Sequence, residues 1–275
     1  MREARKQSIG VFDSGFGGIN ILRGIVKELP EYNYLYLGDT ARSPYGARST
    51  NVVYEFTKQA VDFLFAHNCE LIILACNTAS SSALRRIQRE YLPKYYPNKK
   101  VLGVLIPAAE VAATKTRNKK IAVIATEGTV NSRAFIKEIK KLDRKIYVFQ
   151  QACPLLVPIV EAGEHKSAVT ALILKKYLKI VKAKKVDTLI LGCTHYGILE
   201  KKIRKIIDPN IAIVSEAIVV PKKLRGYLKK HSAIEKKLRK NGKVMFYTTD
   251  LTERFIALGS KFFDKKINAK KAIIK

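Results

Sequence analysis

Two segments of the chain each bring a cysteine to the end of an apolar run. Residues 70–78 read ELIILACNT and residues 187–195 read DTLILGCTH, so an acidic residue opens each run and a threonine follows each cysteine. Both runs are typical of buried strands, and a helical pattern comes next in each case. Ligands bind at the carboxyl ends of such strands, and a helix N-terminus lowers the pKa of a thiol. We therefore expect Cys76 and Cys193 to face each other across one site.

Two thiols on opposite faces of a small molecule can invert a stereocentre without a cofactor. A thiolate removes a proton from the carbon, and the thiol on the far side returns one. Because the Cα of an amino acid is only weakly acidic, oriented donors must stabilise the negative charge that develops. The candidate donors are the backbone N–H groups of the glycine turn at 13–18 and the side chains of Asn77, Thr78, Thr129 and Thr194. Asp13 and His195 are candidates to tune the thiols as base and acid.

The same cysteines permit other chemistries. A bond between them would make a redox protein, and a single nucleophile would need only one of them with a base. A metal would require more than two soft ligands, with His195 as a third candidate. The chain contains no CxxC and no spacing typical of a zinc site, and its cysteine usage fits a reducing compartment.

Strand and helix patterns alternate along the chain, which predicts parallel, doubly wound sheets. The expected strands lie at 9–12, 34–37, 71–75, 101–106, 121–125, 145–150, 188–192, 211–214 and 243–248. The expected helices lie at 19–29, 49–67, 80–91, 107–114, 131–142, 167–182, 198–207, 221–230 and 252–263.

The second half of the chain loosely repeats the first. Residues 9–12 and 121–124 are similar strands that each run into a small, polar, glycine-containing turn, and the two cysteine segments repeat at nearly the same offset. Such self-similarity indicates two related units. We therefore expect an α/β fold with two related doubly wound parallel-sheet domains and the active site between them.

Composition narrows the class of protein. The 275 residues suffice for one large domain or two ordinary ones, and no apolar run reaches the length of a membrane span. The N-terminus lacks the apolar core of a signal peptide, so we expect a cytoplasmic protein. The formal charge is +29, from 52 Lys and Arg against 23 Asp and Glu. That charge leaves a nucleic-acid partner as an alternative, although the lysines are scattered and would equally attract an anionic small substrate.

The glycine turn has a competing interpretation. A strand, a Gly-x-Gly turn, a helix and then Asp39 after a second strand imitate a dinucleotide-binding unit. The third glycine position is Asn20, however, and the carboxylate of Asp13 would repel a pyrophosphate. The turn is therefore better interpreted as part of the thiol site.

Several motifs taken together resemble the bacterial glutamate racemases. They occur in order along nearly the whole chain, and they read VFDSGFGG (11–18), GDTARSPYG (38–46), ACNTA (75–79), TEGTV (126–130), ACP to Glu161 (152–161), LGCTHY (191–196) and FYTTD (246–250). The resemblance implies a cofactor-independent isomerase that interconverts L- and D-glutamate for peptidoglycan synthesis. It also implies a homodimer whose substrate is a small molecule.

The resemblance also assigns residues and domains. Cys76 would deprotonate D-glutamate and Cys193 L-glutamate. The residues that would bind the substrate or tune the thiols are Asp13, Ser14, Pro44, Tyr45, Gly46, Asn77, Thr78, Thr129, Glu161, Thr194 and His195. The tail would return to the first domain, which gives one domain of residues 1–100 plus 212–275 and a second of residues 101–211.

The chain departs from the family pattern at two places. Gly197 replaces a usual proline, and Val214 stands where an aspartate usually precedes the serine of 214–216. A racemase for aspartate or another amino acid on the same scaffold is the alternative among enzymes, and a basic nucleic-acid-binding protein is the alternative outside them.

Overall fold

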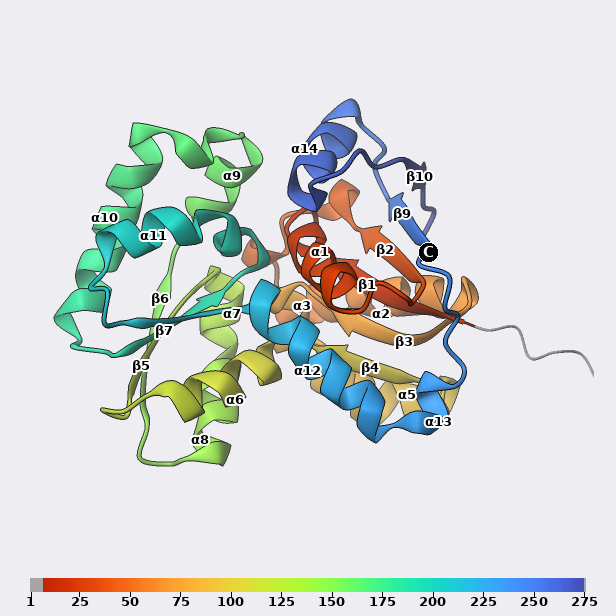
Figure 1. Cartoon of the computed structure of the whole chain (residues 1–275), viewed down its shortest axis with the longest axis horizontal. Helices are drawn as coiled ribbons and strands as arrows, with labels where there is room; N and C mark the ends of the chain where they lie inside the picture. Colours follow the sequence, from red (N-terminus) through yellow and green to blue (C-terminus); the bar gives the residue numbers. More distant parts are fainter. Residues whose placement is uncertain (1–6, 275) are drawn as a thin grey trace, which may run out of the picture.

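The computed structural model describes residues 7–274, and its two lobes each contain a parallel sheet (Figure 1). The first sheet has the strand order β10-β9-β2-β1-β3-β4. Its strands are β1 (Ser8–Asp13), β2 (Tyr34–Gly38), β3 (Cys69–Leu74), β4 (Lys100–Gly103), β9 (Val244–Thr248) and β10 (Ala269–Lys271). The second sheet has the order β6-β5-β7-β8, with β5 (Lys120–Ala125), β6 (Tyr147–Ala152), β7 (Thr188–Gly192) and β8 (Ala212–Ser215).

The strand orders confirm that the two halves are related. The first four strands of the chain are arranged β2-β1-β3-β4, and the next four repeat that arrangement as β6-β5-β7-β8. In this comparison β3 corresponds to β7, so the strands that precede Cys76 and Cys193 occupy equivalent places. The tail adds β9 beside β2, and β10 beside β9, to the first sheet.

Helices cover the sheets, and several of them border the cavity between the two lobes. In the first lobe they are α1 (Gly18–Glu28), α2 (Thr50–Ala66), α3 (Asn77–Ser82), α4 (Leu84–Arg86), α5 (Leu92–Tyr95), α12 (Glu216–Lys230), α13 (Ser232–Glu235) and α14 (Glu253–Phe263). In the second they are α6 (Leu105–Lys115), α7 (Glu127–Ser132), α8 (Ala134–Leu142), α9 (Leu156–Glu161), α10 (Ala168–Ala183) and α11 (Glu200–Ile206). Short turns of 3-10 helix are η1 (Thr40–Arg42), η2 (Tyr45–Ala47), η4 (Glu164–Lys166) and η5 (Thr194–Leu199), and a π-helical turn, η3, spans Ile87–Tyr91.

Two strands lie in the opposite sheet from the one expected. β4, expected to open the second domain, pairs with β3, and β8, expected to belong with the tail, pairs with β7. Alternation along the sequence predicts the type of an element, whereas its sheet depends on which neighbour it pairs with. We accordingly propose domain limits at about residues 103 and 215, in place of 100 and 211.

Helix α12 joins the lobes, since it packs on α1 of the first and α6 of the second. The close approach to α1 requires a glycine, because a Cβ at Gly24 would lie 2.4 Å from the backbone oxygen of Ala217. This helix was expected at 221–230, and in the structure it begins five residues earlier, at Glu216. One further expected helix, 131–142, is broken at Arg133, whose φ of 55° is left-handed.

The acidic residue that opens each cysteine strand stabilises the fold. Glu70 is only 2% exposed and accepts from Lys99 Nζ and Lys237 Nζ, each at 2.8 Å, which ties β3 to the segment before β4 and to the tail. Asp187 accepts from the backbone N–H groups of Arg117 and Asn118, both at 2.7 Å, and so holds the turn that leads into β5.

Removing the charge of Glu70 should therefore destabilise the protein. We expect Glu70→Gln to lower the free energy of unfolding by about 2 kcal/mol, because two lysines lose a buried anionic partner. Urea denaturation measures the change. Glu55→Gln is the matched control, since Glu55 pairs with Lys58 at an exposed position and such pairs contribute about 0–1 kcal/mol. Equal losses in the two variants would contradict the prediction.

Candidate active site

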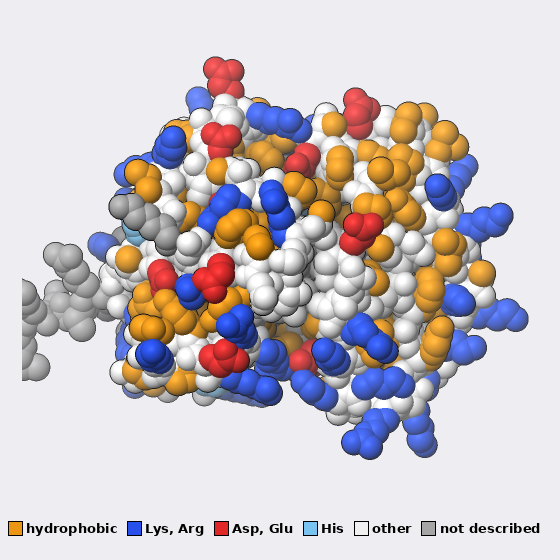
Figure 2. All heavy atoms as spheres, turned by 180° about the vertical axis from the view of Figure 1, so that it is seen from behind, with side chains coloured by type: hydrophobic (Ala, Val, Ile, Leu, Met, Phe, Trp, Pro, Cys, Tyr) orange, Lys and Arg blue, Asp and Glu red, His pale blue; other side chains and the backbone are white. Residues whose placement is uncertain are grey.

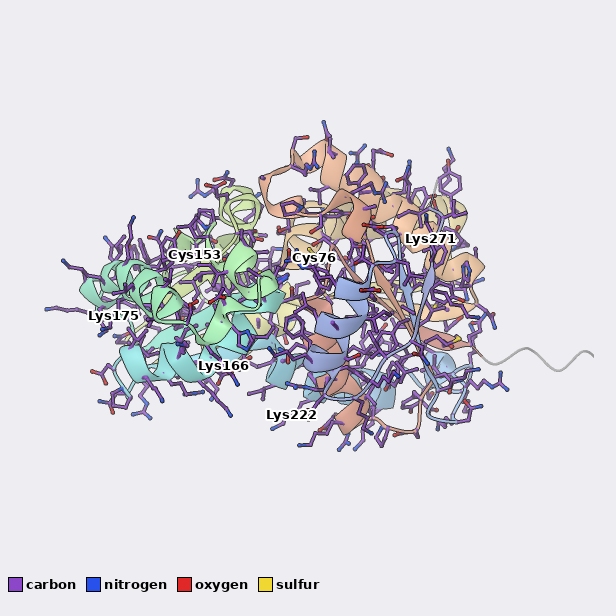
Figure 3. All side chains as sticks on the ribbon, turned by 90° about the horizontal axis from the view of Figure 1, so that it is seen from above. Cys76, Cys153, Lys166, Lys175, Lys222 and Lys271 are labelled. Carbon is purple, nitrogen blue, oxygen red and sulfur yellow. The ribbon has the colours of Figure 1, made fainter. Side chains whose placement is uncertain are left out.

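The two cysteines line one cavity of about 550 Å³ between the lobes. Figure 3 shows Cys76 where the lobes meet, while Cys153 lies inside the second lobe. The predicted site residues in the cavity wall are Ser14, Pro44, Tyr45, Gly46, Cys76, Asn77, Thr78, Glu161, Cys193, Thr194 and His195. Asp13 and Thr129, which were also predicted, are fully buried behind that wall.

Cys76 lies at the N-terminus of α3 and is surrounded by donors. Its Sγ lies 3.3 Å from Ser14 Oγ and 3.5 Å from the backbone N of Ala79. Burial, with a smaller contribution from the nearby Asp13, nevertheless raises the pKa of the Cys76 thiol to about 11. The expected lowering by the helix N-terminus is therefore wrong in net effect, because α3 has only six residues and desolvation of the thiolate outweighs its backbone donors.

Cys193 follows β7 and precedes the 3-10 turn η5, and α11 begins only at Glu200. Its Sγ lies 3.8 Å from Nδ1 of His195. Burial raises the pKa of the Cys193 thiol well above its ordinary value, and a backbone hydrogen bond at His195 partly opposes this shift. Both thiols are thus protonated at neutral pH in the ligand-free protein.

Acid–base groups extend behind the cysteines. Nε2 of His195 lies 3.0 Å from Oε1 of Glu161, so this pair orients the imidazole beside Cys193. Thr194 Oγ1 donates to Oδ2 of Asp13 at 3.3 Å, which links the second cysteine segment to the end of β1. Burial raises the pKa of the Asp13 carboxyl, and the His195 charge opposes that effect.

The glycine turn approaches the second lobe closely. A Cβ at Gly17 would lie 2.2 Å from Thr194 Oγ1, so this position leaves no room for a side chain. The backbone N–H of Gly15 donates to Asp13 Oδ1 at 2.9 Å. This backbone N–H is therefore occupied by the carboxylate of Asp13 and is not free to bind a phosphate. The contact argues against the dinucleotide interpretation.

A hydroxyl chain crosses between the lobes on the other side of the cavity. Thr78 Oγ1 lies 3.0 Å from Thr126 Oγ1, and Thr126 Oγ1 in turn donates to Thr129 Oγ1 at 3.0 Å. Thr129 therefore reaches the cavity only through Thr126, which lines it and was not predicted.

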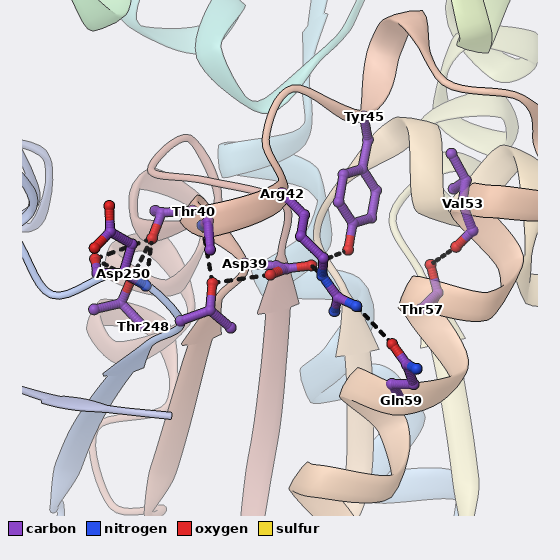
Figure 4. Close-up of polar contacts among 11 residues, drawn as sticks. Asp39, Thr40, Arg42, Tyr45, Val53, Thr57, Gln59, Thr248 and Asp250 are labelled. Carbon is purple, nitrogen blue, oxygen red and sulfur yellow. Dashed lines mark hydrogen bonds and ion pairs between the residues drawn. The ribbon is translucent and has the colours of Figure 1, made fainter. Parts of the chain in front are cut away.

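The wall at 44–46 is held from behind by Asp39 (Figure 4). This fully buried carboxylate accepts from the Tyr45 hydroxyl, from Nε of Arg42 at 2.7 Å and from Thr249 Oγ1 at 2.9 Å. Arg42 continues to Gln59 on α2, where its Nη1 donates to Oε1 at 2.6 Å. Asp39, which resembled the acidic residue of a dinucleotide-binding unit in the sequence, thus has a structural role.

Sequence reasoning missed several charged residues at the cavity, namely Glu127, Asp250 and Arg254 in its wall and Glu216 behind it. Glu216, at the start of α12, is 3% exposed and accepts from Nδ2 of Asn77 at 2.6 Å. Arg254 on α14 lines the cavity, and its Nη2 donates to the backbone oxygen of Glu161 at 2.8 Å, across the lobes. The only signal for Glu216 was its place in the segment that departs from the family pattern, and Arg254 lies on an exposed helix face that gives none.

Other surfaces and ligand types have less support. Figure 2 shows lysine and arginine side chains spread over one face among hydrophobic groups. Within residues 7–274, no group of three or more His, Cys, Asp or Glu side chains is placed to hold a metal ion. No helix in that range is long and apolar enough to cross a membrane.

Comparisons with known proteins agree on one family. The Asp/Glu/Hydantoin racemase family matches residues 9–217. The chain is 38% identical to a glutamate racemase of Thermoanaerobacter pseudethanolicus over 259 residues, which cover 94% of each chain. Its fold is similar to a glutamate racemase of Bacillus anthracis, with a TM-score of 0.90, 32% identity and 98% of each chain covered. A glutamate racemase of Francisella tularensis, solved with D-glutamate, gives a TM-score of 0.87 at 31% identity and 98% coverage of each chain.

Alkylation should report the raised thiol pKa. In a Cys193→Ala background, we expect the rate of Cys76 alkylation by iodoacetamide to rise about tenfold per pH unit through pH 10, because the thiolate population is still growing there. The Cys76→Ser, Cys193→Ala double variant supplies the background from Cys69 and Cys153. A plateau below pH 9.5 would show an ordinary thiol instead.

Proposed function

Because this chain belongs to the Asp/Glu/Hydantoin racemase family, we propose that it interconverts L- and D-glutamate without a cofactor. The observation that carries the proposal is the placement of Cys76 and Cys193. They follow equivalent strands of the two related lobes and line the same cavity. A substrate between them would present one face to each sulfur.

The proton transfers balance in both directions. The Cys76 thiolate removes the Cα proton of D-glutamate, and the Cys193 thiol returns a proton to the opposite face, which yields L-glutamate. Cys193 is then the thiolate and Cys76 the thiol, so the reverse reaction begins from that state. Each turnover therefore needs one thiol to ionise, even though burial raises the pKa of both.

Substrate binding helps with this ionisation. The ammonium group of glutamate brings a positive charge into a water-poor cavity, where it stabilises a nearby thiolate more strongly than in water. Ser14 beside Cys76, and the His195–Glu161 pair beside Cys193, act on the two sulfurs separately. Asp13 and Thr129 act through Thr194 and Thr126.

Polar groups in the cavity wall match a dicarboxylic amino acid. Asn77, Thr78 and Thr194 offer amide and hydroxyl groups to the carboxylates, and Arg254 supplies a cation among the lining residues. The net charge of +29 also favours the approach of an anion. Aspartate remains the alternative substrate, and a nucleic-acid partner rests on the charge alone.

In the cell the product would be D-glutamate for peptidoglycan synthesis, made in the cytoplasm. The family relationship supports this role. Growth of a D-glutamate auxotroph that carries this chain, without added D-glutamate, is the corresponding test.

Racemisation can be followed directly by circular dichroism. We expect the pure protein, with no cofactor added, to abolish the optical signal of either glutamate enantiomer, and to act on glutamate in preference to aspartate and other amino acids. Cys76→Ser and Cys193→Ser should each lose racemisation by at least about a thousandfold, because one face of Cα loses its acid or base.

Exchange of the Cα proton with deuterated solvent shows which cysteine serves each face of the substrate Cα. Cys76→Ser should impair exchange of D-glutamate more, and Cys193→Ser that of L-glutamate. Cys69→Ser, at a buried position outside the cavity wall, is the matched control and should retain racemisation. Unchanged rotation with both enantiomers would overturn the proposed function, and equal impairment of both exchanges would overturn the assignment of faces.

We also propose that the protein is a homodimer. Its α9–α10 region exposes apolar side chains, with Leu172 65% and Val169 60% exposed, and Leu155 and Ile180 also on the surface. Light scattering should give twice the chain mass of 31.0 kDa. A Leu172→Lys variant should shift that mass toward the monomer, and a wild-type mass of one chain at micromolar concentration would contradict the dimer.

A further inference from the structure

A buried amide–carboxyl pair lies behind the cysteines where the two lobes meet. Asn77 opens α3 directly after Cys76, and Glu216 opens α12 directly after β8 of the second sheet. Nδ2 of Asn77 donates to Oε2 of Glu216 at 2.6 Å. Asn77 is 2% exposed and Glu216 3%, so the pair is nearly closed to water.

Each member of this pair has one oxygen without a partner. Oδ1 of Asn77 and Oε1 of Glu216 are both buried, and neither has a hydrogen bond in the described structure. Two orphan acceptors on side chains that already share one bond are costly while both remain acceptors. A single proton on the carboxyl group supplies the missing donor, since a neutral carboxyl donates through O–H and still accepts through its carbonyl oxygen.

We propose that Glu216 is a positioning residue that carries a proton when substrate binds, and that its two-bond pairing with Asn77 fixes the amide in the cavity wall. The carboxyl O–H donates to Oδ1 of Asn77, while Nδ2 of Asn77 donates to the other carboxyl oxygen. The second N–H of Nδ2 is then held for a carboxylate of the substrate. This inference rests on the proposed racemisation of glutamate.

Electrostatics favours the neutral carboxyl. Burial, reinforced by the nearby Asp13, raises the pKa of Glu216 to about 8. Loss of the proton would remove the donor to Asn77 and add a negative charge that raises the pKa of Cys193. An anionic substrate would then meet an Asn77 amide that is no longer held in place, and the negative charge of Glu216 would repel it.

The elements that pack on α12 are α1, α6, α13, β8 and η5. Their ionisable side chains are Arg23, Lys27, Glu28, Glu110, Lys115, His195, Tyr196 and Glu235. Of these, Glu28 and Glu110 form ion pairs with Arg225 and Lys223 of α12 itself, and His195 pairs with Glu161. Asp13 and Cys193 are thus the groups that most directly share the environment of Glu216.

The pH dependence of KM tests the proposal. Between pH 7 and 9.5 the wild-type KM for glutamate should rise roughly tenfold more than that of Glu216→Gln, because the glutamine amide stays neutral and can form the same two-bond pair. Titration of the substrate ammonium is common to both proteins and cancels in this comparison. Glu110→Gln, which removes a half-exposed carboxylate that pairs with the same helix, should follow the wild-type profile.

A second variant separates positioning from packing. Glu216→Ala leaves Asn77 unpaired, so its KM should be high at every pH, and Gln at the same position should rescue it. A parallel rise of KM in the wild type and Glu216→Gln, or a flat wild-type profile, would overturn the proposal.

Thermal unfolding gives a readout that does not require activity. The folded protein keeps the Glu216 proton up to about pH 8, whereas the unfolded chain releases it in the ordinary carboxyl range. The stabilisation is therefore complete below that range and is lost as the pH rises to about 8. The Tm of Glu216→Gln relative to the wild type should consequently increase between pH 5 and 9, and a constant difference would overturn the inference. Absence of racemisation in the wild type would overturn the proposed function instead, while this difference still decides whether Glu216 holds the proton.

Discussion

The desolvation of two thiols in one cavity is the constraint on which the rest of the site depends. The Cα of an amino acid is so weakly acidic that its deprotonation needs a strong base. Burial makes a thiolate a stronger base, but it also lowers the fraction of thiol that is ionised. The donors around Cys76 and the backbone hydrogen bond at His195 beside Cys193 oppose that burial only in part. In the proposed mechanism, ionisation of a thiol therefore depends on the positive charge that the substrate brings into the cavity.

The same constraint explains why the lobes are joined so closely at the cavity. Gly17 lies against Thr194 and Thr78 against Thr126, and both of these pairs span the two lobes. Asn77 bonds Glu216 at the start of α12, the helix that packs on both lobes. The Thr78–Thr126 and Asn77–Glu216 pairs are fixed polar contacts beside the cavity that both cysteines line. Such contacts leave less of the cavity wall open to water, which favours the proposed proton transfers.

The repeated strand order explains the equivalent placement of the two cysteines. The common order β2-β1-β3-β4 and β6-β5-β7-β8 places an equivalent cysteine at the carboxyl edge of each sheet. The neighbours of those two cysteines differ. Ser14 and Asp13 act beside Cys76, and the imidazole of His195 acts beside Cys193. Two similar strands thus carry cysteines with different neighbours, as the proposed exchange of acid and base roles requires.

The sequence by itself determined most element types, the two cysteines and about half of the cavity wall, because these depend on local periodicity and on motifs such as ACNTA and LGCTHY. Only the tertiary structure decided which sheet receives β4 and β8. Each pairs with the strand that precedes it, β3 and β7, and the periodicity of a strand does not record its partner. The tertiary structure also reversed the expected shift of the Cys76 pKa, because burial is a property of the packed molecule and not of the helix end. Glu216 and Arg254 entered the site for the same reason: each acts through a residue more than ninety positions away, Asn77 and Glu161, and no spacing along the sequence records that contact.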